Sequence, residues 1–449
     1  MRSQLNRPNS ILEEKDKKKQ VSPDQEMKIY KAPTADEKLQ TVTVLSIDGG
    51  GSRGFIPAFI LLHLEKYLQE CDKDDTVRIS DYFDVVAGSG TGSIIAAMLT
   101  VPDDYHNKRP RFDMQQIVDS LKEIFHTFTY FKYSWIYRLF TGRRVPQDDF
   151  NRIIRDKLKG THLDETLKNV VIPVYNDKTK RPFIFSSSQP NKDRILLSDV
   201  VRGSSALPAY LDPLEIKYQG EDCRFIDGGL VSTNPTLFAL QEAEKLVIKT
   251  EPDYKNYLVL SLGTTKRHGL PEITWHLLYW FFGIFSRGDW GSRALQYVYD
   301  TFSDATEIYM MQLLKCHHDN KNYLRIQAHR EDSLTSFANP SESSTYQKLK
   351  NLVKVLYINP FAHLRPVPAI IDGSRGSINK LKNIGEKILV NYVACINPYT
   401  GDVERKSQTN KEALKEFARK LSDERKKRLP DLKMNKKVKA YSQKTSTKN

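Results

Sequence analysis

Cysteines and long apolar runs are scarce in this chain of 449 residues. The cysteines are widely spaced, so they indicate neither a metal site nor a disulfide framework: Cys71, Cys223, Cys316 and Cys395. The start of the chain lacks the apolar core of a signal peptide. No stretch reaches the roughly 18 apolar residues of a transmembrane helix. We therefore expect a reduced, cytoplasmic protein that is soluble or peripheral on membranes.

Most of the chain also lacks a large excess of one charge sign, except at the carboxyl end. The formal net charge is +14, and residues 403–449 hold 16 Lys and Arg against 6 Asp and Glu. Residues 1–40 hold 9 against 7, so the long body between these ends is nearly neutral. A basic tail on a neutral body indicates an anionic partner, such as a lipid headgroup or nucleic acid, unless the tail is only a solvated appendage.

The pattern of apolar residues predicts one large domain flanked by two tails. Residues 1–40 are rich in charge and poor in apolar periodicity, and we expect them to be mobile. Strands then alternate with helices, which predicts an α/β fold whose mostly parallel sheet is covered by helices on both faces. We expect a core over 41–245, its C-terminal part over 246–400, and a basic helix and tail over 401–449.

A glycine-rich loop follows the first expected strand. Residues 41–47 are β-branched and apolar, as in a buried strand, and the loop Asp48–Gly54 separates them from an apolar helical stretch. Such a loop presents backbone N–H groups to an anion. Its glycine spacing matches a dinucleotide-binding fingerprint, but no strand leads into the acids Glu70 and Asp72 that would bind the ribose. The alternative function is an oxyanion hole for acyl transfer.

The stretch from Phe83 to Leu99 has the layout of a strand, a sharp turn and a helix. Its turn reads Gly-Ser-Gly-Thr-Gly over residues 88–92. This layout is typical of the nucleophile elbow, G-x-S-x-G, in which small residues allow the strand and helix to pack closely. The turn is present here, but its central position, where a serine is expected, is Gly90.

A third motif has an acid on a glycine turn at the end of an expected strand, Asp227-Gly228-Gly229. In this order and at these separations, the three motifs resemble the patatin-like phospholipases, the plant lipid acyl hydrolases. The resemblance is firm over about residues 41–265 and looser to about residue 400. It implies a patatin-like three-layer α/β fold.

The resemblance also implies a Ser–Asp dyad that acts on membrane lipids, either phospholipid or galactolipid. It implies no cofactor, no metal and no nucleic-acid partner. By position, Asp227 is the dyad acid and Gly90 stands at the nucleophile position. The remaining site positions are the oxyanion loop, the small elbow residues and the acid's turn: Gly49, Gly50, Gly51, Ser52, Arg53 and Gly54; Gly88 and Gly92; Gly228 and Gly229.

Glycine at position 90 cannot form an acyl-enzyme, because it has no hydroxyl. Triad enzymes that lose a member keep about 10³–10⁴-fold acceleration over water, and we expect no more here. Ser89 is a substitute if the turn slips by one residue, although this puts the β-branched Thr91 in a small position. Ser93 is expected to be a cap or a first-turn residue of the helix. A water molecule activated by Asp227 is a further route.

Two functions therefore remain open at the level of sequence. One is a lipid acyl hydrolase with weak activity, and the other is a catalytically silent lipid-binding or regulatory protein on the same scaffold. Two aromatic stretches, 125–140 and 275–285, belong either to the core or to a surface that docks on a membrane.

Overall fold

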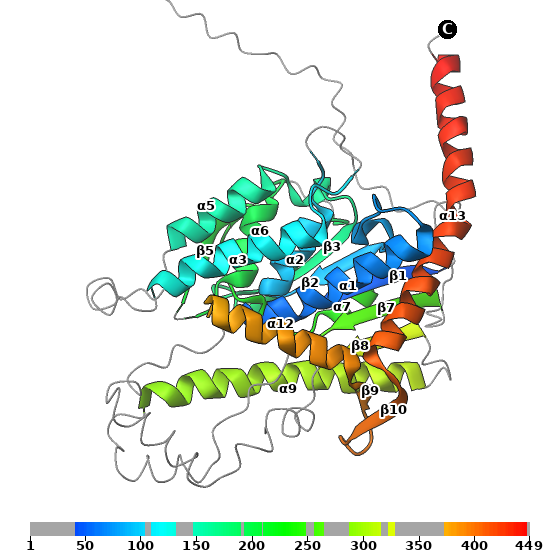
Figure 1. Ribbon diagram of the computed structural model, residues 1–449. Helices are drawn as coiled ribbons and strands as arrows, with labels where there is room; N and C mark the ends of the chain where they lie inside the picture. The colour runs from blue at the N-terminus through cyan, green and yellow to red at the C-terminus, as the bar shows by residue number, and fades with distance from the viewer. Residues whose placement is uncertain are drawn as a thin grey trace, which may run out of the picture.

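The computed structural model describes most of the chain (Figure 1). The described residues are 41–103, 109–131, 147–189, 193–208, 210–247, 256–264, 287–315, 322–327 and 372–446. The expected N-terminal tail and the aromatic stretch 275–285 lie outside them. Among the described helices, none is both long and apolar enough to cross a membrane.

An eight-stranded sheet runs through the centre of the molecule. Its neighbours follow the order β5-β6-β3-β2-β1-β7-β8, with β4 paired to β3. The parallel strands are β1 (Val42–Ile47), β2 (Val85–Gly88), β3 (Asn169–Asn176), β7 (Tyr257–Leu262) and β8 (Tyr323–Ile326). The antiparallel strands are β4 (Arg181–Ser186), β5 (Leu214–Tyr218) and β6 (Glu221–Ile226).

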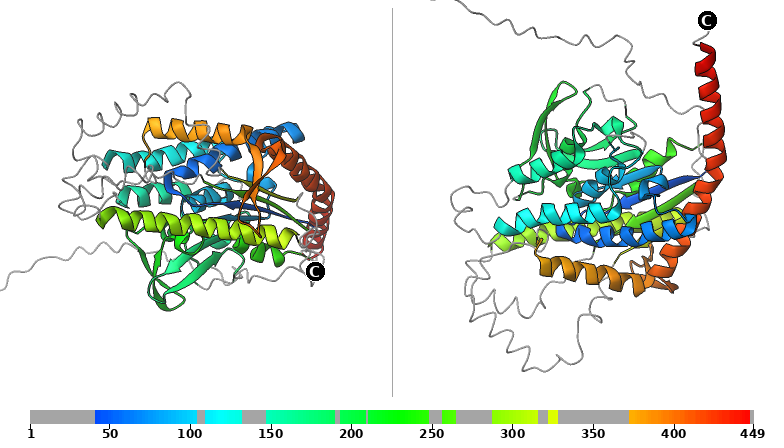
Figure 2. Two further views of the ribbon diagram at one scale, coloured as in Figure 1. Left: turned by 90° about the horizontal axis from the view of Figure 1, so that it is seen from below. Right: turned by 45° about the horizontal axis from the view of Figure 1, so that its top comes forward.

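Helices cover both faces of this sheet (Figures 1 and 2). One face packs against α1 (Phe55–Asp72), α2 (Thr91–Thr100), α3 (Met114–Phe131), α5 (Gln147–Leu158), α6 (Leu197–Ser205) and α12 (Arg375–Val390). The other packs against α7 (Thr236–Glu244) and α9 (Arg287–Lys315). Short 3₁₀ turns complete the domain: η2 (Gly51–Gly54), η3 (Ile79–Asp81), η4 (Leu163–Glu165) and η5 (Gly228–Leu230).

Strand β1 shows why the sequence forms this architecture. All six of its residues are buried, and successive side chains point to opposite faces. Leu45 and Ile47 belong to one apolar core, whereas Val42 and Val44 belong to the other. A strand that must be apolar on both faces belongs in the middle of a covered parallel sheet. The predicted three-layer α/β fold is therefore confirmed.

The C-terminal part of the chain differs from the basic helix and tail expected over 401–449. Residues 403–409 form β10 (Val403–Thr409), which pairs with β9 (Tyr392–Ile396), and α13 (Asn410–Ser446) starts only then. The first half of α13 is part of the body, because Leu414, Phe417 and Leu421 are buried in the core. Beyond this half, the helix runs away from the domain (Figures 1 and 2).

The sheet register brings the predicted motifs together. Ile47 pairs with Gly88 on one side and with Leu262 on the other, so β1, β2 and β7 end at the same level. The glycine-rich loop, the elbow and Thr264 follow these three strands, and they therefore meet at the carboxyl edge of the sheet. In open α/β sheets this edge is where ligands bind.

Candidate active site

The turn after β2 has Gly90 at its apex. Gly90 has φ 51° and ψ −120°, a backbone conformation that L-residues rarely adopt. Its two neighbours at i±2 must be glycine for a different reason. A Cβ atom on Gly88 would lie 2.2 Å from the carbonyl oxygen of Gly92, and one on Gly92 would lie 2.2 Å from that of Ile47. The structure thus adopts the elbow register in which Gly88 and Gly92 are the close-packed positions.

The apex has room for a side chain. A Cβ atom on Gly90 would lie 3.7 Å from Gly49 Cα and 4.0 Å from Asp227 Oδ1, both ordinary contact distances. A side chain here would therefore sit between the glycine-rich loop and the carboxylate of Asp227. The amide of Gly90 donates to Ser204 Oγ at 3.2 Å, and Ser93 Oγ donates to its carbonyl at 2.6 Å. These bonds fix the turn from both sides.

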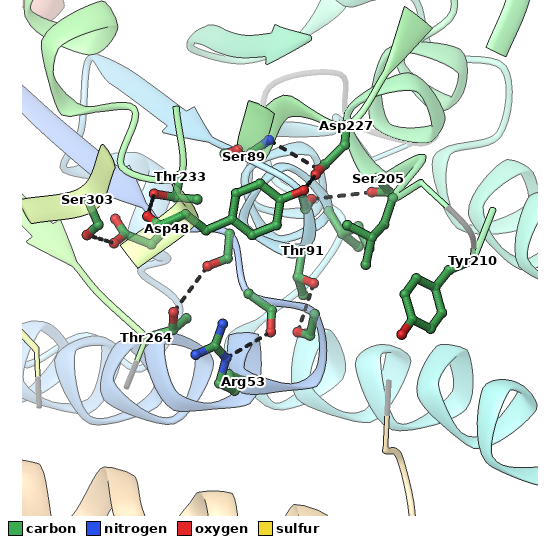
Figure 3. A pocket seen from close by; sticks show the side chains of 18 of the residues that line it. Asp48, Arg53, Ser89, Thr91, Ser205, Tyr210, Asp227, Thr233, Thr264 and Ser303 are labelled. Atoms are coloured by element: carbon green, nitrogen blue, oxygen red, sulfur yellow. Dashed lines mark hydrogen bonds between the residues drawn. The ribbon is translucent and has the colours of Figure 1, made fainter. Parts of the chain in front are cut away.

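Asp227 is buried, with its carboxylate held by two donors (Figure 3). It follows β6 and caps η5, where Oδ1 accepts the amide of Gly229 at 3.1 Å. Oδ2 accepts the hydroxyl of Tyr299 from α9. Burial raises the pKa of Asp227 to about 6, and the two hydrogen bonds oppose this rise. The group is therefore mostly ionised at neutral pH and has the proton affinity that suits a general base.

Hydrogen bonds hold the glycine-rich loop in place beside Gly90. Its Gly49 amide donates to the carbonyl of Thr233 at 3.0 Å, and the hydroxyl of Thr91 donates to the carbonyl of Gly51 at 2.8 Å. Arg53 Nε donates to the Gly50 carbonyl at 3.4 Å. The amides of Gly50 and Gly51 donate to no acceptor among the described residues. This loop can therefore offer two N–H groups to a developing oxyanion.

Ser52 and Gly54 are buried residues at the end of this loop. Ser52 is fully buried. A Cβ atom on Gly54 would lie 2.5 Å from Thr91 Cγ2, so glycine is needed where the loop crosses the elbow helix. The structure gives no support to the dinucleotide alternative. Asp72 lies at the far end of α1, about 27 Å along the helix by its rise per residue, and it is bonded to Arg425.

A buried ion pair anchors the start of the loop. Arg325 in β8 donates to Asp48 through both terminal nitrogens, at 2.8 and 2.6 Å. Ser303 in α9 adds a bond to the same carboxylate at 3.3 Å. Arg325 is not among the candidate site residues expected from the sequence. Its signal is faint: a charged residue inside a short apolar strand needs a buried partner. No local pattern marks Tyr299 or Ser303, because their role comes only from the docking of α9.

One pocket joins these groups to an apolar wall. Of the predicted site residues, the pocket is lined by Gly49, Gly50, Gly51, Arg53, Ser89, Gly90, Asp227 and Gly229. Its apolar side chains come from Ile94, Phe125, Phe128, Phe150, Leu207 and Leu211. Phe125 and Phe128 are thus buried pocket residues, and the part of the aromatic stretch over 132–140 lies outside the described residues. A polar end and an apolar wall suit an ester with a hydrocarbon chain.

The serine beside the apex lines the pocket, but its side chain is buried. Ser89 is fully buried, and its hydroxyl has no hydrogen-bond partner among the described residues. A Cβ atom on Gly228 would lie 3.0 Å from Ser89 Oγ, so this hydroxyl lies against the turn that carries Asp227. Gly228 must be glycine for a second reason, because its Cβ would lie 2.4 Å from the carbonyl oxygen of Pro173.

Comparisons with known proteins agree with this arrangement of motifs. A family model described as patatin-like phospholipase matches residues 45–240. Patatin-like protein 2 of Oryza sativa subsp. indica is 33% identical over 88% of this chain and 96% of its own. Patatin-like protein 4 of Arabidopsis thaliana is 32% identical over 86% and 93%, and patatin group M-3 of Solanum tuberosum is 30% identical over 86% and 91%. This chain belongs to the patatin-like phospholipase family.

Proposed function

We propose that this protein hydrolyses acyl ester bonds of membrane lipids, phospholipid or galactolipid, without a serine nucleophile. Asp227 is the general base, and a water molecule beside Gly90 is the nucleophile. The observation that carries this proposal is the distance of 4.0 Å between Asp227 Oδ1 and the position of a Cβ atom at residue 90. The base therefore faces the place from which a nucleophile would attack.

The steps of the proposed reaction use only groups that line the pocket. The carboxylate of Asp227 takes a proton from the water while the water oxygen attacks the ester carbonyl. The amides of Gly50 and Gly51 donate to the oxyanion of the tetrahedral intermediate. Collapse breaks the bond to the alcohol oxygen, which takes the proton back from Asp227. The products are a free fatty acid and the deacylated lipid.

This route is slower than nucleophilic catalysis. In triad enzymes that lack a member, substrate binding and the oxyanion hole alone give about 10³–10⁴-fold acceleration over water. The carboxylate of Asp227 and the apolar wall favour hydrolysis over lipid binding alone. Binding of a lipid does not by itself require a buried carboxylate that faces Gly90. Burying that charge costs free energy, and carboxylates with such raised pKa values cluster at functional sites.

A comparison of two variants tests this function. Asp227→Asn keeps the size of the side chain and should abolish the release of fatty acid from phospholipid vesicles, whereas Ser89→Ala should leave it unchanged. Wild-type protein should also form no adduct with an organophosphonate. Loss of activity only in Ser89→Ala, or an adduct on a serine, would show that a serine acts as the nucleophile and that the water mechanism is wrong.

The second candidate function is lipid binding without hydrolysis. The absence of a side chain at residue 90 favours it, because no covalent intermediate can form there. Wild-type protein that binds lipid vesicles, releases no fatty acid and is unaffected by Asp227→Asn would establish this function in place of the first.

A further inference from the structure

Helix α9 places two side chains, one turn apart, against two acids of the site. One of them, Ser303, is labelled beside Asp48 in Figure 3. Tyr299 donates its hydroxyl proton to Oδ2 of Asp227, and Ser303 donates to Oδ2 of Asp48 at 3.3 Å. Both side chains are more than nine-tenths buried, with exposed fractions of 6% and 8%. Residues i and i+4 lie on one face of a helix, so a single face of α9 contacts both acids.

The backbone of the same helix turn is tied to the oxyanion loop. Thr233 donates from Oγ1 to the carbonyl of Tyr299 at 2.8 Å. The carbonyl of Thr233 in turn accepts the amide of Gly49 at 3.0 Å. A continuous set of hydrogen bonds therefore runs from the loop through Thr233 to Tyr299 and on to Asp227. These contacts fix the spacing between the group that takes the proton and the groups that bind the oxyanion.

We propose that Tyr299 is a positioning residue for Asp227. The Tyr299 hydroxyl donates a hydrogen bond to Oδ2 of Asp227, so that Oδ1 faces Gly90. With Tyr299 on one oxygen and the amide of Gly229 on the other, the carboxylate cannot rotate away from the apex without losing a bond. Without the phenol, a buried oxygen would lose its donor. This inference rests on the proposed role of Asp227 as the base.

Tyr299 also affects the charge of Asp227. A donor to the ionised form favours that form, so the phenol opposes the rise in pKa that burial causes. Asp48, paired with Arg325, also lines the pocket, as do Arg53 and Asp300. The pKa of Asp227 responds to burial and to its two hydrogen bonds rather than to these charges. Removal of the phenol should therefore leave more of Asp227 protonated at neutral pH.

A carboxyl NMR titration of the native chain tests the inference without any assay of activity. The ¹³C resonance of the Asp227 carboxyl is assigned by its loss in Asp227→Asn. Tyr299→Phe should raise its midpoint by about 1 pH unit or more, the size expected for a bond to an ionised group. Tyr309→Phe is the matched control, because Tyr309 is on the same helix and 57% exposed. An unchanged midpoint in Tyr299→Phe would overturn the inference.

A second variant covers the case in which Tyr299→Phe does not fold. Difluorotyrosine at position 299 keeps the shape of the ring but is a stronger donor, and it should move the Asp227 midpoint to lower pH. No shift in this protein would equally overturn the inference.

Kinetics in a Gly90→Ser background provide the catalytic readout. Tyr299→Phe should lower kcat about tenfold or more with little change in KM, and it should move the acid limb of the pH profile upward. A fall in kcat with an unmoved acid limb would contradict a role through Asp227. If neither wild type nor Gly90→Ser hydrolyses any ester, the proposed function fails, but the NMR titration still decides the role of Tyr299.

Discussion

At the scale of single residues, the proposed site has a glycine at the apex of its turn, where the elbow motif would carry a serine. The backbone at Gly90 keeps the positive φ of an elbow, and its neighbours keep the close contacts that only glycine allows. An L-residue in such a conformation costs on the order of 1–3 kcal/mol. Glycine at this apex therefore avoids that strain, and in the proposed mechanism it leaves the attack to a water molecule.

The pH dependence of hydrolysis should follow the protonation of Asp227. Because the pKa of this buried group is raised to about 6, its base form is lost as the pH falls below that value. We expect kcat/KM to fall about tenfold for each pH unit below about 6 and to be flat above about 7. The measurement is a pH profile with a neutral water-soluble ester. A profile that is flat down to about pH 4 would exclude Asp227 as the base.

The same carboxylate should lower the stability of the fold. Its folded-state pKa, about 6, lies above the ordinary value of 3.8, so its contribution to stability is fully present below about pH 4 and is lost as the pH rises through 6. Asp227→Asn should therefore be more stable than wild type at about pH 8, by up to ~3 kcal/mol, with a smaller difference at about pH 4. Urea denaturation at both pH values checks this, and a variant that is less stable at pH 8 would contradict it.

At the scale of elements, the C-terminal helix is both part of the core and the start of a tail. Besides its apolar residues, Arg428 contacts the Asp84 carboxylate at 2.8 Å, and Arg425 contacts that of Asp72 at 2.6 Å. The first half of α13 is thus bound to the domain by packing and by charge. Deletion of all the residues after 403 would remove this half as well as the basic tail.

Phe417→Ala should destabilise the domain by about 3–5 kcal/mol, the usual cost of truncating a buried aromatic side chain. Phe417 is 2% exposed and contacts the larger core. Lys411→Ala, at an exposed position of the same helix, is the control and should change stability by less than about 0.5 kcal/mol. Thermal unfolding of the two variants measures the difference. Equal stability would show that α13 is not part of the core.

Elements with a local signature could be predicted from the sequence, and those fixed by docking could not. The loop, the elbow and the turn at Asp227 each combine an apolar strand with glycines, so residue types alone revealed them. Residues 403–409 look like part of a charged helix, but pairing with β9 makes them a strand. Tyr299 is an ordinary helical tyrosine until α9 is placed against the site.

At the scale of the whole molecule, the tail and the pocket are at opposite ends of the sheet. Arg428 bonds to Asp84 and to the carbonyl of Thr41, which precede β2 and β1. The pocket lies beyond the other ends of these strands, about 20 Å away for a six-residue strand. Contacts of the tail with an anionic surface would therefore hold the protein near a membrane without touching the site.

Deletion of residues 430–449 should weaken binding to anionic vesicles but leave hydrolysis of a water-soluble ester unchanged. This segment contains six lysines, and each basic residue near an anionic surface contributes about 1 kcal/mol. The loss should be large at low salt and small at high salt, because salt screens charge attraction. Flotation of full-length and truncated protein with vesicles measures it. Equal binding of the two proteins at low salt would mean that the tail is a solvated appendage.

The most direct test of the account is a comparison of Gly90→Ser with Gly90→Ala in the hydrolysis of p-nitrophenyl esters. Both variants add a Cβ atom to the same space, 4.0 Å from Asp227 Oδ1, and both bear the same backbone strain. We predict that the serine variant is at least tenfold faster than wild type and forms an organophosphonate adduct, because the base and the oxyanion loop are already in place. The alanine variant should be slower than wild type, because its methyl group takes the place of the attacking water. A folded Gly90→Ser protein no faster than Gly90→Ala would contradict the proposal that this site has its base and oxyanion loop in place and lacks only a nucleophilic side chain.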